Sequence, residues 1–86
     1  MSFYVYFLIS HNKKRTISYV GYTKDLKKRV NLHNSSKGAK FTKGRKWVLI
    51  YNKRYKSKSI AMKEEYKLKK NYKLRSGLKN NYLIKI

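Results

Sequence analysis

Acidic residues are scarce in this sequence: Asp25, Glu64 and Glu65 are its three carboxylates among 86 residues. Hard divalent cations take oxygen ligands, usually including a carboxylate, and a two-ion site needs several of them. We expect Asp25 to cap a helix, and the adjacent Glu64 and Glu65 to point about 100° apart on another. The scarcity argues against a paired-metal phosphodiesterase site and leaves room for one ion on one carboxylate. The alternative interpretation is that both glutamates only favour the positive end of their helix.

Cysteine and proline are absent altogether. Without cysteine there is no disulfide and no thiolate metal site, which is consistent with a reducing, cytoplasmic location. No apolar run reaches the roughly 18 residues of a membrane helix. The apolar stretch 2–10 has no basic leader or small-residue cleavage site, so we expect a strand there and not a signal. With no linker and no internal repeat, residues 1–86 are expected to form a single domain.

Positive charge is what the chain has in excess: 24 Lys and Arg give a net charge of +21, spread along the whole sequence. Such a domain repels itself and favours a polyanionic partner, nucleic acid first and acidic membrane second. No helix with a wide apolar face is obvious, so we expect no membrane partner. The nine Tyr, three Phe and one Trp argue for a folded core. In a bacterium, such a protein would be nucleoid-associated.

The hydrophobic pattern predicts an α/β (α+β) fold, a three-stranded antiparallel sheet flanked by helices in ββαβα order. Strands are expected at 3–9, 16–21 and 47–51, the first central and paired with the second as a hairpin. Helices are expected at about 25–34, capped by Asp25, and at 60–70, capped by Ser57 or Ser59, with a weaker trailing helix at 71–86. Residues 34–45 have neither period and are expected to form a basic loop with two glycines.

Two tyrosines and the basic side chains nearby could carry chemistry. Tyr6 and Tyr19 are expected on adjacent strands that face the helix bearing Arg29, although packing a sheet is the alternative role for each tyrosine. His33, one turn after Arg29, could bind phosphate or transfer a proton near neutral pH, or be a satisfied histidine at a helix end. His11 lies in a polar turn and is expected to be solvated. No phosphate-cradling glycine loop and no Ser or Cys nucleophile with a base is present.

The ordered motifs resemble the GIY-YIG endonuclease domain, and within it the small stand-alone, UPF0213-like subgroup. The strand motifs are Tyr4-Val5-Tyr6, which departs from the family at Tyr4, and Tyr19-Val20-Gly21, which differs only by a conservative valine. Residues 23–33 resemble the catalytic helix of the family and residues 38–45 its loop. Residues 57–69 resemble the helix that bears the family's glutamate, which selects Glu65 over Glu64. The resemblance covers residues 3–70, the expected catalytic core.

This resemblance implies hydrolysis of DNA phosphodiester bonds with one divalent ion, Mg²⁺ or Mn²⁺, in repair or recombination of branched or damaged DNA. The implied roles are metal ligation by Glu65, general-base catalysis by Tyr6 with help from Tyr19, transition-state stabilisation by Arg29, and phosphate contact or proton transfer by His33. A free tyrosine has a pKa of about 10, and we expect the cations around Tyr6 to lower its pKa. The alternative is a non-catalytic, basic nucleic-acid-binding protein on the same fold, for DNA or RNA.

A basic strip is expected in the loop after the first predicted helix, at Lys37, Lys40, Lys43, Arg45 and Lys46. It could follow a phosphate backbone, and the alternative is a solvated loop. If about six phosphates are neutralised, log affinity for duplex DNA should fall with log salt at a slope near −5. No element for reading base edges is evident. A protein partner would then supply specificity.

Overall fold

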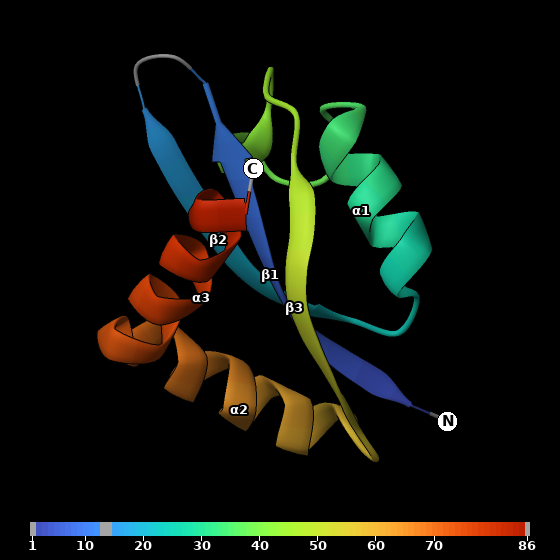
Figure 1. Ribbon diagram of the computed structural model, residues 1–86. Coiled ribbons are helices and arrows are strands. Elements are labelled where there is room, and N and C mark those ends of the chain that lie inside the picture. Colours follow the sequence, from blue (N-terminus) through green and yellow to red (C-terminus); the bar gives the residue numbers. More distant parts are fainter. Residues whose placement is uncertain (1, 13–14, 86) are drawn as a thin grey trace.

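The computed structural model describes residues 2–12 and 15–85 and places one sheet between helices (Figure 1). Its strands are β1 (Phe3–His11), β2 (Thr16–Thr23) and β3 (Val48–Tyr55). They pair antiparallel in the order β2-β1-β3, so β1 is central, as its apolar sequence predicts. The α+β class and the antiparallel three-stranded sheet are confirmed.

The helices follow in the predicted order. They are α1 (Leu26–Asn34), the short 3₁₀ turn η1 (Lys40–Thr42), α2 (Lys58–Lys70) and α3 (Tyr72–Lys85). Asp25 caps α1 through Oδ1, which accepts the Lys28 backbone N–H at 3.1 Å. Ser57, and not Ser59, caps α2 by accepting the N–H of Ile60.

Element boundaries differ from the sequence prediction in all three strands and at the start of α2, which begins at Lys58. Strand β1 runs on to His11, which pairs with Thr16, and β2 runs on to Thr23, which pairs with Tyr4 at the start of β1. Strand β3 continues to Tyr55, since its polar residues still pair with the start of β1. The loop expected over 34–45 contains η1, which is too short to show a period.

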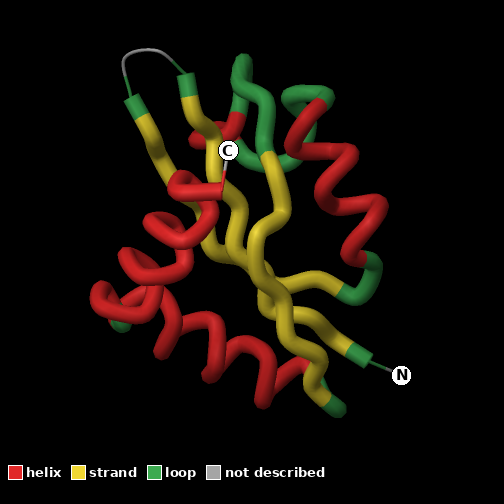
Figure 2. Tube along the Cα trace, in the orientation of Figure 1, coloured by secondary structure: helices red, strands yellow, loops and turns green. Residues whose placement is uncertain are grey.

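Alternate residues of β1 point to opposite faces of the sheet, and each face has its own core. Val5 and Phe7 pack with Ala61 and Leu68 of α2. Tyr6 and Leu8 pack on the other face, with Trp47 and the apolar side of α1. Figure 2 shows the yellow strands running between α1 on one side and α2 with α3 on the other.

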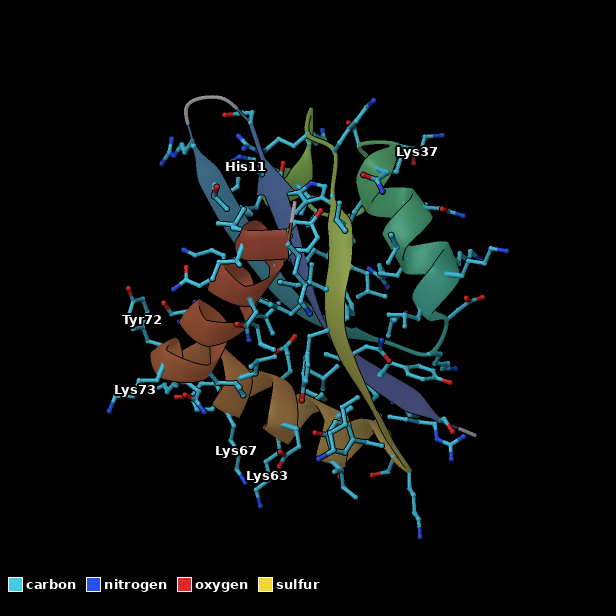
Figure 3. The ribbon with its side chains drawn as sticks, in the orientation of Figure 1. His11, Lys37, Lys63, Lys67, Tyr72 and Lys73 are labelled. Atoms are coloured by element: carbon cyan, nitrogen blue, oxygen red, sulfur yellow. The ribbon has the colours of Figure 1, made fainter. Side chains whose placement is uncertain are left out.

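Four of the lysines can be followed on the outer surface of the protein. In Figure 3, Lys37 lies just beyond the end of α1, Lys63 and Lys67 lie along α2 and Lys73 lies on α3, all directed away from the sheet. Over the described residues, no helix is both long and apolar enough to cross a membrane.

Candidate active site

A cleft of about 610 Å³ is lined by residues of β1, β2, α1 and α2. Because β2 is an edge strand, side chains from both faces of the sheet can meet there. Four predicted site residues come together in its wall, one from each element: Tyr6, Tyr19, Arg29 and Glu65. They are far apart in sequence, and the fold brings them to one hollow.

Tyr6 reaches the cleft because its strand partner is a glycine. Gly21 lies opposite Tyr6 in the β1–β2 register. A Cβ at Gly21 would stand 2.6 Å from Cζ of Tyr6, so any larger residue would displace the phenol ring. The Tyr6 side chain is 1% exposed, and its ring centroid lies 6.3 Å from that of Tyr19. The two phenols are therefore neighbours, as predicted.

His33 is fully buried behind Tyr6, and both of its ring nitrogens are hydrogen-bonded. Nε2 lies 2.8 Å from Oη of Tyr6, and Nδ1 lies 2.9 Å from Oγ1 of Thr42. The Thr42 hydroxyl donates to the carbonyl of Ala39 at 3.0 Å, so it accepts from Nδ1–H of His33. This assignment from the network makes Nε2 an acceptor, and Tyr6 donates to it.

His33 therefore reaches the cleft only through Tyr6, and its side chain does not line the cleft. Phosphate contact would need a free ring nitrogen, whereas proton transfer through Tyr6 fits the observed bond and stays a prediction. Burial lowers the pKa of His33 below its usual 6.5, and the charge of Arg29 lowers this pKa further. The imidazole is accordingly neutral near pH 7 and able to accept a proton.

The pKa of Tyr6 moves in the opposite direction from our prediction. Burial raises it well above the usual 10, and Tyr19 and Glu65 raise it further. Arg29 lowers it, as expected, but by less than burial raises it. The predicted net lowering is wrong for the protein alone, because periodicity does not reveal that the phenol is buried.

The two adjacent glutamates of α2 face different surroundings. Glu65 lines the cleft with a carboxylate that is 17% exposed, and its Oε1 lies 3.4 Å from Nζ of Lys69. Glu64 pairs with Lys67 at 3.2 Å and lines a separate, smaller hollow. The choice of Glu65 over Glu64 as the cleft residue agrees with this geometry.

The donor set of the cleft fits one hard divalent ion. Asp25 also lines the cleft, but its Oδ1 is engaged in capping α1. Glu65 keeps Oε2 without a partner among the described residues. No three His, Cys, Asp or Glu side chains cluster anywhere in the described ranges 2–12 and 15–85. One carboxylate completed by water and phosphate oxygens suits Mg²⁺, which retains several waters, and does not suit a pair of ions.

Comparison with known proteins agrees with this cleft. The family model described as the GIY-YIG catalytic domain matches residues 2–80. The chain belongs to the GIY-YIG family. UPF0213 proteins of Staphylococcus aureus, from strains Mu3 and Mu50 among others, are 50% identical over 52 residues. Those 52 residues are 59% of this chain and 63% of each relative, so the match spans less than two thirds of the relatives' own length.

A solved relative is also similar over most of its length. The UPF0213 protein of Bacillus halodurans, known from a solution NMR structure, is 34% identical and aligns with 93% of this chain and 84% of its own. The TM-score of that alignment is 0.49. The sequence of this GIY-YIG protein is thus similar to those of the UPF0213 proteins of Staphylococcus aureus.

The remaining GIY-YIG motif residues do not line the cleft. Val5 and Val20 are buried in the core beneath α2. Tyr4, at the position where the family has glycine, is half-buried and pairs with Thr23 and Arg54 on its two neighbouring strands. All three belong to the β1–β2 ladder in which Tyr6 lies opposite Gly21.

Three cleft lysines were missed by sequence reasoning: Lys24, Lys28 and Lys58 line the cleft beside Arg29. A usable signal was present for one of them, because Lys58 precedes Glu65 by seven residues and therefore shares its helix face. The guanidinium of Arg29 has no hydrogen-bond or ion-pair partner among the described residues. It is therefore free to bind an anion.

The predicted basic strip lies outside this wall: none of its five members lines the cleft. The strip runs through η1. Two hydrogen bonds hold η1 in place: the Thr42 hydroxyl accepts one from His33 of α1, and the Thr42 carbonyl accepts one from Nε1–H of Trp47 at 2.9 Å. Arg45 is half-buried and its Nε donates to Oγ of Ser10 at 3.1 Å. The other four members of the strip are exposed: Lys37, Lys40, Lys43 and Lys46.

Proposed function

We propose that this protein is a metal-dependent endonuclease that hydrolyses DNA phosphodiester bonds. The observation that carries the proposal is the meeting of Tyr6, Tyr19, Arg29 and Glu65 in one cleft, from four separate elements. Packing alone would not require two phenols, a partner-free guanidinium and a partly buried carboxylate to line the same hollow. Membership of the GIY-YIG family supports the same reaction class.

Glu65 would hold the divalent ion, Mg²⁺ or Mn²⁺. When bound, such an ion supplies Lewis-acid stabilisation of charge on the phosphate. The three cleft lysines bring positive charge to the same hollow and would attract the DNA backbone before chemistry begins.

Tyr6 acts in this proposal as the general base. The oxygen of a water molecule forms a bond to phosphorus, and the water proton passes to the Tyr6 oxygen. The bond from phosphorus to the leaving sugar oxygen breaks, and this oxygen keeps the bonding electrons and takes a proton from solvent water. The proton that Tyr6 itself carried moves along its hydrogen bond to Nε2 of His33, 2.8 Å away. Thr42 accepts Nδ1–H of His33 before and after this transfer, so no side chain has to turn.

Arg29 and Tyr19 complete the proposed site. The planar fork of Arg29 can hold two phosphate oxygens at once and stabilises the charge that develops in the transition state. Tyr19 lies with its ring centroid 4.9 Å from that of His33 and 6.3 Å from that of Tyr6. It positions both partners of the proton transfer.

The resemblance to the GIY-YIG family suggests a role in DNA repair or recombination, on branched or damaged DNA. A second candidate is a non-catalytic nucleic-acid-binding protein, favoured by the net charge of +21 and by the raised pKa of Tyr6. The two candidates differ in whether a product is formed.

The test compares Glu65→Ala with Glu64→Ala on labelled duplex, flapped and branched DNA with Mg²⁺. The adjacent glutamate is a matched control, since both belong to α2 and both pair with a lysine. We expect cleavage by the wild type and by Glu64→Ala, and none by Glu65→Ala, whose DNA affinity without metal persists. Metal-independent binding with no product from any substrate would establish the non-catalytic alternative.

A further inference from the structure

Phe41 is an exposed aromatic residue on a short, well-fastened turn. It is 58% exposed, whereas the next residue of η1, Thr42, is fully buried. Its ring stacks on Tyr19 with centroids 6.3 Å apart and planes 24° apart, and it lies 6.4 Å from the ring of Trp47. One side of Phe41 therefore rests on other rings while much of the ring faces solvent.

The turn that carries Phe41 is held from both sides. Thr42 receives a hydrogen bond from His33, and the Thr42 carbonyl receives one from Trp47 at 2.9 Å. The N–H of Thr42 also donates to the carbonyl of Ala39 at 3.1 Å. An exposed ring with such support binds a ligand without first having to be ordered.

The charge around Phe41 is of one sign. Lys40 is the first residue of η1 and Lys43 directly follows it, and both are exposed, as are Lys37 and Lys46 in the same loop. The three acidic residues of the chain lie at the start of α1 and on α2, and no ion pair in the described part of the protein involves a loop lysine. The loop therefore offers cations to an incoming anion around an aromatic face.

We propose that Phe41 is a stacking platform for an unpaired base of a single-stranded DNA segment, whose phosphates contact the loop lysines. Aromatic rings in a basic surface bind single strands in this way, because every base has a π-face and every nucleotide a phosphate. A base inside an intact duplex is already stacked and cannot occupy the ring. The inference rests on the proposed function for its ligand, and it names the substrate class as DNA with a single-stranded flap, end or branch.

The position of Phe41 links this platform to the cleft. Tyr19 stacks on Phe41 and also lines the cleft, so one tyrosine ring separates the two sites. A strand whose base rests on Phe41 thus has its neighbouring phosphates close to Tyr6 and Arg29. This arrangement selects the junction between paired and unpaired DNA for cleavage.

The test is a binding measurement without divalent metal, so it does not depend on cleavage. The probes are an oligonucleotide containing 2-aminopurine, the same base in a flap, and the same base within a duplex. We expect quenching of 2-aminopurine fluorescence in the single strand and the flap and none in the duplex. Phe41→Leu should weaken single-strand binding about 10-fold and leave duplex binding unchanged, and Phe41→Trp should retain it.

Tyr72→Leu is the matched control, because Tyr72 is 70% exposed and lies on α3, which packs with α2 on the opposite side of the sheet. It projects away from the molecule in Figure 3 and should bind both DNA forms like the wild type. Equal affinity of Phe41→Leu and the wild type for single strands would overturn the proposal, as would an equal loss for strand and duplex. A change of oligomeric state in Phe41→Leu would also overturn the proposal, because it would mean that the Phe41 ring forms a contact between two copies of this chain. A protein that cleaves nothing can still pass this test, and an active nuclease can fail it.

Discussion

The two faces of β1 bury different kinds of side chain. On the face that α2 covers, Val5 and Phe7 pack against apolar partners, and burial by itself stabilises the fold. On the α1 face the same strand buries Tyr6 in front of the fully buried pair His33 and Thr42. Burying a polar group without a partner costs about 1–3 kcal/mol. On the α1 face, the hydrogen bonds among Tyr6, His33 and Thr42 offset the cost of burying these polar groups. The apolar residues on the α2 face need no such hydrogen bonds.

This difference separates stability from chemistry within one strand. Each polar atom of the Tyr6–His33–Thr42 chain has a partner. A fold that needed only a core could use apolar residues at all three positions at similar or lower cost. Changes to this hydrogen-bond chain on the α1 face should therefore impair cleavage as well as stability, whereas changes in the apolar core of the α2 face should lower stability alone.

Among changes on the α1 face, the largest loss of cleavage is expected at Arg29, which belongs to α1 and lines the cleft. Arg29→Ala should lower the rate constant about 1000-fold, by analogy with other arginines that stabilise transferring phosphoryl groups. Arg29→Lys should be nearly as damaging, because a lysine keeps the charge but not the fork. Single-turnover cleavage, with thermal melting to show that the fold is intact, measures both. Near-wild-type cleavage by Arg29→Lys would contradict the two-oxygen role.

Tyr6→Phe should lower cleavage about 100-fold, the lower end of what a general base contributes. It also leaves Nε2 of His33 without its donor, at about 1–3 kcal/mol of stability. Phe7→Leu, the next residue on the opposite face, should cost a similar 1–2 kcal/mol through lost packing and leave the rate unchanged. Rates and urea unfolding are measured at a temperature where both variants are folded. If both variants lose cleavage equally, the two faces are not functionally distinct.

Much of the site could be predicted from the sequence, because it depends on local patterns. The helix period brings Arg29 to the side of α1 that carries Leu26 and Val30, and helix geometry separates Glu64 from Glu65. The short connection between the two antiparallel strands brings Tyr6 near Tyr19, with Tyr6 opposite Gly21 and Tyr19 opposite Leu8. These relations need only periodicity and strand pairing.

The partner of His33 could not be predicted in this way. Thr42 is nine residues from His33, and the two meet because the chain reverses after α1, where Ser36 adopts a positive φ of 64°. Gly38 permits the close approach, since a Cβ there would lie 2.8 Å from Cε1 of His33. The depth of burial that raises the pKa of Tyr6 depends on the same packing. Neither the hydrogen bond between His33 and Thr42 nor the burial of Tyr6 leaves a periodic pattern in the sequence.

Thr42→Val tests whether the far end of the hydrogen-bond chain matters. Valine keeps the shape and removes the acceptor of Nδ1–H, so His33 can exchange tautomers and no longer presents a fixed acceptor to Tyr6. We expect about a 10-fold loss of cleavage and a loss of about 1–3 kcal/mol of stability. The ¹⁵N chemical shifts of His33 should show a mixture of tautomers, whereas Thr42→Ser keeps the wild-type shifts and rate. A valine variant with an unchanged tautomer and rate would limit Thr42 to a packing role.

The smallest expected effect is a dependence of stability on pH that arises from His33. Its pKa is lowered in the folded protein by burial and then by Arg29, so below pH 6.5 the unfolded chain binds a proton that the folded protein excludes. The contribution is complete above pH 6.5 and declines as the pH falls, by at most about 1.4 kcal/mol per pH unit for one proton. Urea unfolding between pH 5.5 and 8 measures it.

Two histidine variants show which residue causes the dependence of stability on pH. His33→Gln removes the buried imidazole and should flatten the profile, and His11→Gln removes the chain's other histidine, so a slope that persists in it belongs to His33. A profile for the wild type that stays flat down to pH 5.5 would mean that the folded protein accepts the proton. Burial and Arg29 would then not lower the pKa of His33, contrary to the packing around the imidazole.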